Sequence, residues 1–262
     1  MSLLEDSLAI DRSVPQRMTA RADPKYEANT GMFGGWTSAL LLKAVVGHPD
    51  ADGAPSAMTV NFIERIVPGE LVILSVARLG GGRSLTHWRS EVKREHDGAL
   101  LATGTIVLAI RRDTDHSIDA VFPDAPPPHD LPLSNPPGPF GRQVETRVII
   151  GAPPFNRPDM RSLSWNRETS GRAVDAVQLA FMADVYAPRV FHISAAPRPS
   201  STVTLSITYL AGIDELAAVG DDYVLSEAEG TRIEQAQAGS RLRLWSPQGT
   251  LLATSEQLCW FR

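Results

Sequence analysis

Two stretches of the chain repeat each other, and this repeat constrains the fold more than any other feature. Residues 98–111 (GALLATGTIVLAIR) and 249–262 (GTLLATSEQLCWFR) match at six of fourteen positions with a constant offset of 151. A second pair, SAMTVNFI from Ser56 and STVTLSI from Ser201, alternates apolar and polar residues as half-buried strands do. These matches predict an internal duplication of about 110 to 120 residues, the size of a domain.

An apolar helical stretch precedes the strands in each half. Residues 35–46 are stopped by Pro49, and residues 174–186 are stopped by Pro188. Because the first stretch is apolar nearly all round, it must be covered on most sides. The strands expected to follow are 58–67, 71–79, 84–94 and 99–110, then 202–209, 223–233, 240–245 and 250–261, with lead-in strands at 26–29 and 146–150. Short turns between them predict antiparallel pairing.

A proline-rich segment separates the two halves. Eight of the 20 prolines lie between Pro123 and Pro139, where missing N–H donors prevent a helix or central strand. Such a segment can bind aromatic grooves, but its place between similar halves favours a spacer. We predict an N-terminal domain over residues 1–112, a linker over 113–140 and a C-terminal domain over 141–262.

The expected architecture is α+β, with an antiparallel sheet wrapped around one buried helix in each half. This arrangement resembles the hotdog fold, and the two tandem copies resemble the pseudo-twofold double-hotdog acyl-CoA thioesterases of the bacterial thioesterase II type. The resemblance covers nearly the whole chain. It is carried by residues 32–36 (MFGGW), 56–62, 82–84, 179–188 (LAFMADVYAP), 202–209 (TVTLSITY) and 251–258 (LLATSEQL).

The resemblance implies a catalytic set of an Asp, a Thr and a Gln. These fall on Asp184 in the second helix, Thr202 at the start of the next strand and Gln257 in the last strand. Hydrolysis of a thioester needs a positioned water, a proton acceptor and donors for the developing oxyanion. Asp184 would act as the general base, while Thr202 and Gln257 would hold the water. Taken singly, each of the three residues is more often structural.

Two glycine-containing segments are further candidates for substrate contact. Backbone N–H groups at Gly34 and Gly35, opening the first helix, are expected to stabilise the oxyanion. Gly82, Arg83 and Ser84 could contact a phosphate of CoA, although a glycine-rich hairpin turn explains this segment equally well.

The duplication also predicts one active site per chain. Gln257 aligns with Ile106 at the offset of 151, Thr202 with Ala57 in the strand alignment, and Asp184 with Val45 when the helices are aligned on their terminating prolines. Three polar residues of the second copy thus align with apolar residues of the first copy, which leaves only the second copy with a possible catalytic set.

Composition excludes several other classes of function. The net charge of −5 argues against nucleic acid as a partner. No apolar stretch approaches the roughly 20 residues of a membrane span, and without a secretory signal a cytoplasmic location is expected.

The single cysteine, Cys259, is interpreted as a core side chain. The six histidines lack metal-ligand spacing, so neither metal nor cofactor is expected.

The predicted activity is hydrolysis of acyl-CoA to free CoA and carboxylic acid, in lipid metabolism, by a homodimer or higher homo-oligomer. The alternative is a non-catalytic acyl-CoA-binding protein of the same fold. A hotdog hydratase is a weaker candidate because the only Asn-Pro pair, at Asn135, lies in the linker without a following histidine.

Overall fold

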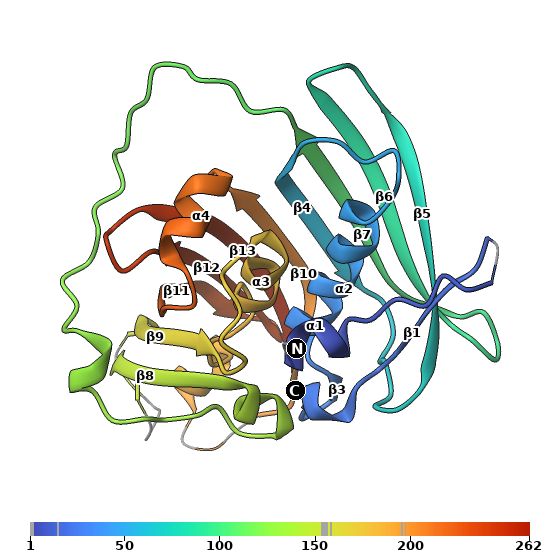
Figure 1. Ribbon diagram of the computed structural model, residues 1–262. Helices are drawn as coiled ribbons and strands as arrows, with labels where there is room; N and C mark the ends of the chain where they lie inside the picture. The colour runs from blue at the N-terminus through green and yellow to red at the C-terminus, as the bar shows by residue number, and fades with distance from the viewer. Residues whose placement is uncertain (1–2, 15, 153–156, 158, 195, 197) are drawn as a thin grey trace.

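Eleven antiparallel strands form one continuous sheet in which the two halves of the chain lie side by side (Figure 1). The computed structural model describes residues 3–14, 16–152, 157, 159–194, 196 and 198–262. The strand order is β1-β5-β6-β7-β4-β10-β13-β12-β11-β9-β8, so the halves meet where β4 pairs with β10. The eight predicted strands are present as β4 (Ala54–Phe62), β5 (Leu71–Gly81), β6 (Leu85–Arg94), β7 (Leu100–Ala109), β10 (Ser200–Tyr209), β11 (Val224–Glu234), β12 (Gln237–Trp245) and β13 (Leu251–Phe261).

The ends of the sheet differ from the sequence prediction. The outer strands are β1 (Met18–Arg21) at one edge and β9 (Ser162–Glu168) and β8 (Val144–Ile150) at the other, and only the last of these was predicted. The expected lead-in strand at 26–29 is present only as a two-residue strand, β2 (Glu27–Ala28), which lies outside the main sheet. Before it, Asp23 caps the short helix η1 (Pro24–Tyr26) by accepting from the Lys25 N–H at 3.0 Å.

Several short elements complete the chain. The pair β2 (Glu27–Ala28) and β3 (Gly31–Met32) forms a separate small ribbon. The remaining short helices are α1 (Leu3–Ser7), α4 (Ile213–Val219), η2 (Pro128–Asp130), η3 (Pro139–Gln143) and η4 (Arg189–Ile193).

One helix of each half packs against the sheet, and the two helices pack against each other. Helix α2 (Gly34–Val46) agrees with its prediction, and most of its side chains are buried. Helix α3 (Ala176–Met182) is shorter than the predicted 174–186 because Asp175 caps its start and the chain turns directly after Met182. In the described part of the chain, no helix is long and apolar enough to cross a membrane.

The strand order relates the two halves by a pseudo-twofold axis between β4 and β10. Moving outward from this seam, the order β4, β7, β6, β5 in the first half corresponds to β10, β13, β12, β11 in the second. Both seam strands carry a register shift at the same place, between Pro55 and Ala57 on β4 and between Thr202 and Thr204 on β10. The duplicated sequence therefore keeps even its β-bulge.

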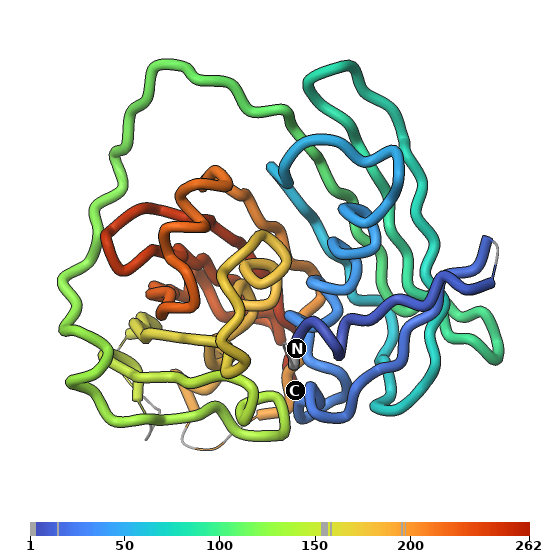
Figure 2. The backbone as a smooth tube through the Cα atoms, in the orientation of Figure 1, coloured from blue at the N-terminus to red at the C-terminus, as the bar shows by residue number. Residues whose placement is uncertain are grey.

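The proline-rich segment covers the C-terminal half. It runs as a long loop around the outside of that half (Figure 2), and its apolar residues pack on one side of the sheet. Phe122 meets Trp245 with ring centroids 5.7 Å apart, and the Trp165 indole donates to the carbonyl of Pro126 at 2.9 Å. The segment is thus an ordered cover as well as a connector. The division into residues 1–112, 113–140 and 141–262 stays a prediction.

Candidate active site

Asp184, Thr202 and Gln257 lie together although they are far apart in the sequence. The Gln257 side-chain Nε2 donates to Asp184 Oδ1 at 2.5 Å and to Thr202 Oγ1 at 3.0 Å. Asp184 is 9% exposed and Gln257 is 8% exposed. The three side chains that the sequence singled out therefore form one hydrogen-bonded cluster, in which Asp184 and Gln257 are buried and Thr202 is half-buried.

Two neighbouring strands and one turn hold this cluster. Thr202 lies near the start of β10 opposite Cys259 of β13, and Gln257 lies on β13 opposite Leu205. Asp184 is not on a helix as predicted, because α3 ends at Met182. It lies in the turn that follows, where the Tyr186 N–H donates to the Asp184 carbonyl at 3.0 Å. This turn directs the carboxylate toward the strands.

Burial controls the charge of Asp184. Desolvation raises the pKa of its carboxyl to about 7, because a charged group loses water when it is buried. The Gln257 amide N–H and the backbone N–H of Gly35 oppose this shift by hydrogen bonding to the ionised form. Gly35 is in the first turn of α2, where the helix dipole also favours a negative charge. The result is a carboxyl group that exchanges its proton near neutral pH.

Gly34 and Gly35 allow Asp184 to approach the start of α2. A Cβ at Gly34 would lie 2.6 Å from Asp184 Oδ2, and one at Gly35 would lie 2.3 Å from the Phe181 carbonyl oxygen. Neither close approach is possible with a larger residue. These glycines were predicted as oxyanion donors, but the Gly35 N–H faces the Asp184 carboxylate. Their role toward a substrate stays a prediction.

Three further residues contact the cluster and were missed as site residues in the sequence analysis. The Tyr186 hydroxyl donates to Gln257 Oε1 at 2.9 Å and lies 2.9 Å from Ser240 Oγ. The Cys259 thiol, interpreted from sequence as a core side chain, is buried and donates to the same Gln257 oxygen at 3.2 Å. Tyr186 and Ser240 stand in stretches that resemble ordinary apolar and strand sequence, so no sequence signal marked them.

The equivalent place in the N-terminal half is apolar. Ile106 pairs with Met58 as Gln257 pairs with Leu205, which confirms the alignment of Gln257 with Ile106. The alignment of Thr202 with Ala57 is wrong. Pro55 is the structural counterpart of Thr202, since Pro55 pairs with Leu108 and Thr202 with Cys259, two residues that correspond at the offset of 151. The sequence alignment was two residues out of register, a shift that the period-two alternation of a strand does not detect.

The neighbouring strand continues this contrast. Ser240 pairs with Gln257, whereas Trp88 pairs with Ile106, so a buried indole occupies the position equivalent to the serine. The residues described thus place a polar cluster in the C-terminal half only.

The predicted CoA-binding segment lies away from this cluster. Gly82, Arg83 and Ser84 connect β5 and β6 next to Leu85, which pairs with Ala109. Ala109 also pairs with Ala54 at the start of β4. The cluster is near the other end of that strand, where the Phe62 ring lies 3.3 Å from the Cβ position of Gly34. Eight residues of strand correspond to roughly 26 Å, so one chain does not bring this segment to Asp184.

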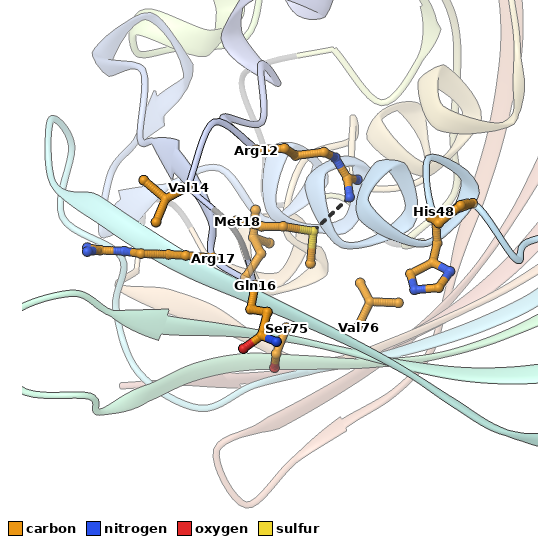
Figure 3. A pocket seen from close by; sticks show the side chains of 10 residues that line it. Arg12, Val14, Gln16, Arg17, Met18, His48, Ser75 and Val76 are labelled. Carbon is orange, nitrogen blue, oxygen red and sulfur yellow. Dashed lines mark hydrogen bonds between the residues drawn. The ribbon is translucent and has the colours of Figure 1, made fainter.

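A surface pocket of about 360 Å³ lies at a different place, between the N-terminal segment and the end of α2 (Figure 3). Arg12 crosses it and donates to the Met18 sulfur at 2.9 Å, and His48 lines it from the residues that follow α2. The lining residues include none of the cluster described above. Within the described residues, no group of three or more His, Cys, Asp or Glu side chains could hold a metal ion.

Solved structures share this fold over nearly their full length. A conserved protein with a hotdog fold from Alicyclobacillus acidocaldarius is 29% identical, with a TM-score of 0.93 over 100% of this chain and 98% of that chain. The tesB protein of Mycobacterium avium subs. paratuberculosis is 20% identical, with a TM-score of 0.81 over 99% and 98% of the two chains. The acyl-CoA thioesterase II TesB2 of Mycobacterium marinum is 18% identical, with a TM-score of 0.78 over 99% and 98%. The predicted α+β double hotdog is therefore confirmed.

Family models match both halves of the chain. Residues 22–109 match the acyl-CoA thioesterase N-terminal domain, and residues 122–261 match the acyl-CoA thioesterase C-terminal domain. No curated protein matches the chain in sequence. The two family models nevertheless match one half of the duplicated chain each, the N-terminal model first and the C-terminal model second. Together with the shared fold, they identify the chain as a member of the acyl-CoA thioesterase family.

Proposed function

We propose that this protein hydrolyses the thioester of acyl-CoA to free CoA and a carboxylic acid, by means of a water molecule positioned by Asp184, Thr202 and Gln257. The observation that carries the proposal is the convergence of these three side chains from a turn and two strands, joined by the two hydrogen bonds of the Gln257 amide. A hydrolase activity is the expectation for the family as a whole. The residues assigned here are our proposal for this chain.

Asp184 is the proposed general base. Its carboxylate accepts a proton from water as the water oxygen bonds to the thioester carbonyl carbon. The tetrahedral intermediate then collapses, the C–S bond breaks, and the CoA sulfur leaves with the electron pair and takes up a proton. A base with a pKa of about 7 suits this role, because it is substantially ionised at neutral pH and still basic enough to take the proton.

Thr202 and Gln257 orient the reacting water in this proposal. The Thr202 hydroxyl accepts from Gln257 Nε2, which leaves its own proton available to donate to water or to an oxygen of the substrate. The Gln257 amide links the base to the hydroxyl, so that all three groups act as one unit. No covalent acyl-enzyme is required, since water itself attacks the carbonyl carbon.

The start of α2 is the proposed place for the thioester carbonyl. Gly34 carries no side chain, and the first N–H groups of a helix have no partner within the helix. Because the Gly35 N–H faces Asp184, a substrate oxygen would have to share or replace that contact. Gly82, Arg83 and Ser84 remain candidates for a CoA phosphate only if a second chain brings its own copy of this segment close to Asp184, or if CoA binds in an extended form along the sheet.

The principal alternative is binding of acyl-CoA without hydrolysis. The observation that keeps it open is the low exposure of Asp184 and Gln257, because a substrate must reach groups that are now covered. A hotdog hydratase is less well supported, since Asp184, Thr202, Gln257 and their hydrogen-bond partners include no histidine.

A panel of short, medium and long acyl-CoA substrates, followed by release of free thiol, tests the function. We expect cleavage by the wild-type protein, with kcat for Asp184→Ala lower by about 10²- to 10⁴-fold and ligand binding by calorimetry retained. The Thr202→Val and Gln257→Leu variants should lose activity in the same assay. Wild-type binding without cleavage of any substrate would favour the binding protein, and conversion of an added enoyl-CoA to 3-hydroxyacyl-CoA, with the thioester intact, would favour the hydratase.

A homo-oligomeric state in the cytoplasm belongs to the same proposal. The outer edges of the sheet, β1 and β8, each pair with a strand on one side only, apart from one isolated bridge between Asp11 and Thr19. Open edges invite pairing with another copy. Light scattering coupled to size-exclusion chromatography should give a mass of at least twice 28.4 kDa, and a monomer at micromolar concentration would contradict this part.

A further inference from the structure

The Tyr186 hydroxyl contacts the Gln257 amide at its oxygen, while Asp184 and Thr202 contact the nitrogen. The hydroxyl donates to Gln257 Oε1 at 2.9 Å, and Ser240 Oγ lies 2.9 Å from the same hydroxyl. We propose that Tyr186 is a positioning residue that holds the Gln257 amide with its N–H groups toward Asp184 and Thr202. This inference rests on the proposed function for its catalytic consequence, but its structural part can be tested without it.

The geometry explains why the amide needs such a contact. A side-chain amide has an oxygen and a nitrogen of similar size, so it can rotate by a half-turn and exchange them. After that exchange the Gln257 oxygen would face the Asp184 carboxylate at the place where the nitrogen now donates at 2.5 Å. Tyr186 and the Cys259 thiol, 3.2 Å away, both donate to the oxygen and disfavour the exchange. Of these two donors the hydroxyl is the stronger.

The Tyr186 ring is itself held in place. The Arg189 guanidinium lies over it, 5.1 Å from the ring centroid. Arg189 is 2% exposed and donates to the carbonyls of Ala187, at 3.1 Å from Nε, and Met160, at 2.8 Å from Nη1. Since the cation is fixed by these carbonyls, the tyrosine has little freedom to leave Gln257. A ring that only filled space would not need its hydroxyl paired with both Ser240 and Gln257.

The consequence of the contact is a lower pKa for Asp184 than burial alone would give. The N–H of a correctly oriented Gln257 amide stabilises the ionised carboxylate. A rotated amide would present its oxygen instead, and the carboxylate would be destabilised. Loss of the Tyr186 hydroxyl should therefore raise the pKa of Asp184 and move the acid limb of the pH–rate profile to higher pH.

Other groups near Asp184 do not titrate in the same range. Cys259 of β13 has a pKa raised to about 12 by burial, and burial also raises the pKa of Tyr186. Arg189 behind the ring has a pKa lowered to about 10, and the pKa of His192 beside Arg189 is lowered to about 4. The first turn of α2, at Gly34 and Gly35, faces Asp184 with backbone groups alone. An acid limb of the pH–rate profile between pH 5 and pH 9 therefore reports the ionisation of Asp184.

The decisive comparison is Tyr186→Phe against Tyr209→Phe. Tyr209 is buried and Tyr186 is half-buried against the same core, but the Tyr209 hydroxyl contacts only the Met58 sulfur, at 3.8 Å, among the described contacts. For Tyr186→Phe we expect kcat to fall by about tenfold or more, KM to change by less than about threefold, and the acid-limb midpoint to rise by about half a unit to one unit. Tyr209→Phe should have the same kcat, KM and acid-limb midpoint as the wild type. An unmoved acid limb with kcat within twofold of wild type would overturn the proposal.

A direct titration separates this inference from the proposed function. Carboxyl ¹³C NMR of Asp-labelled protein, with Asp184→Asn assigning the signal, gives the Asp184 midpoint without any substrate. A higher midpoint in Tyr186→Phe supports the positioning role even if no acyl-CoA is cleaved, and an equal midpoint refutes it even if hydrolysis is confirmed. If Tyr186→Phe does not fold, as judged by circular dichroism, Ser240→Ala decides. A smaller rise of the Asp184 midpoint in Ser240→Ala supports the positioning role of Tyr186, and an unchanged midpoint rejects it.

Discussion

Gln257 and Ile106 occupy equivalent positions in the two halves, since Gln257 pairs with Leu205 across to β10 and Ile106 pairs with Met58 across to β4. A polar amide and an aliphatic side chain thus stand on the same frame of strands, both nearly covered. In the first half, the aliphatic Ile106 side chain has no polar atom and needs only to fill its space in the core. In the second, each polar atom of Gln257 has a partner, which is what burial of an amide requires.

The raised pKa of Asp184 predicts a pH-dependent stability. Its folded value is about 7 against an ordinary value of 3.8, so the folded protein binds more protons than the unfolded chain between these limits. The stabilisation from the protonated carboxyl is complete below pH 3.8 and is lost as the pH rises through 7. We expect Asp184→Asn, which cannot ionise, to gain about 2–3 kcal/mol relative to wild type between pH 5 and pH 8. Urea unfolding at both pH values measures this, and an equal difference at the two would contradict it.

Gly34→Ala should impair catalysis while leaving the fold intact. The added methyl would lie 2.6 Å from Asp184 Oδ2, so the carboxylate must move. We expect kcat to fall by about 10²-fold, the scale of effect of a displacement near 1 Å. Gly212→Ala is the matched control, because its Cβ would meet nothing nearer than Glu215 Oε2 at 3.7 Å. Equal activity of the two variants in the thiol-release assay would show that Asp184 tolerates the displacement.

Cys259 should be unreactive in the folded protein. Burial, with a smaller contribution from Asp184, raises the pKa of its thiol to about 12, so very little thiolate is present at pH 8. A disulfide reagent such as DTNB should label less than about a tenth of the chains in minutes, and one thiol per chain after unfolding in guanidinium, as the single cysteine requires. Rapid labelling of the native protein would mean that the cluster opens readily to solvent.

Trp88 should contribute more to stability than any exposed tryptophan. It is fully buried, and its ring centroid lies 5.0 Å from that of the His48 ring. Its indole Nε1 donates to Thr86 Oγ1 at 2.9 Å. Trp88→Ala is expected to lower the free energy of unfolding by about 3–5 kcal/mol. Trp260→Ala, at a side chain 49% exposed, should cost less than about 1 kcal/mol. Similar costs in urea titrations would show that the N-terminal half does not depend on filling the position equivalent to Ser240.

Part of the sheet was beyond prediction because its polar residues point inward. On β9, Asn166 and Glu168 are buried and Trp165, on the opposite side, is covered by the linker. Both sides of the strand are therefore shielded, and the usual alternation of apolar and polar residues is lost. The linker was predicted from its prolines, but its role as a cover depends on contacts such as that of Phe122 with Trp245.

The sequence by itself determined the duplication, the central strands of both halves, the helix α2 and the identity of the three polar residues that hydrogen-bond to one another. These follow from local periodicity and from comparison of the chain with itself. Only the tertiary structure decided that Asp184 lies in a turn, that Thr202 corresponds to Pro55, and that Tyr186 and Ser240 complete the surroundings of Gln257. The physical reason is that hydrogen-bond partners distant in sequence meet only through strand register and helix termination, and neither a two-residue shift of register nor the last turn of a helix is fixed by local periodicity.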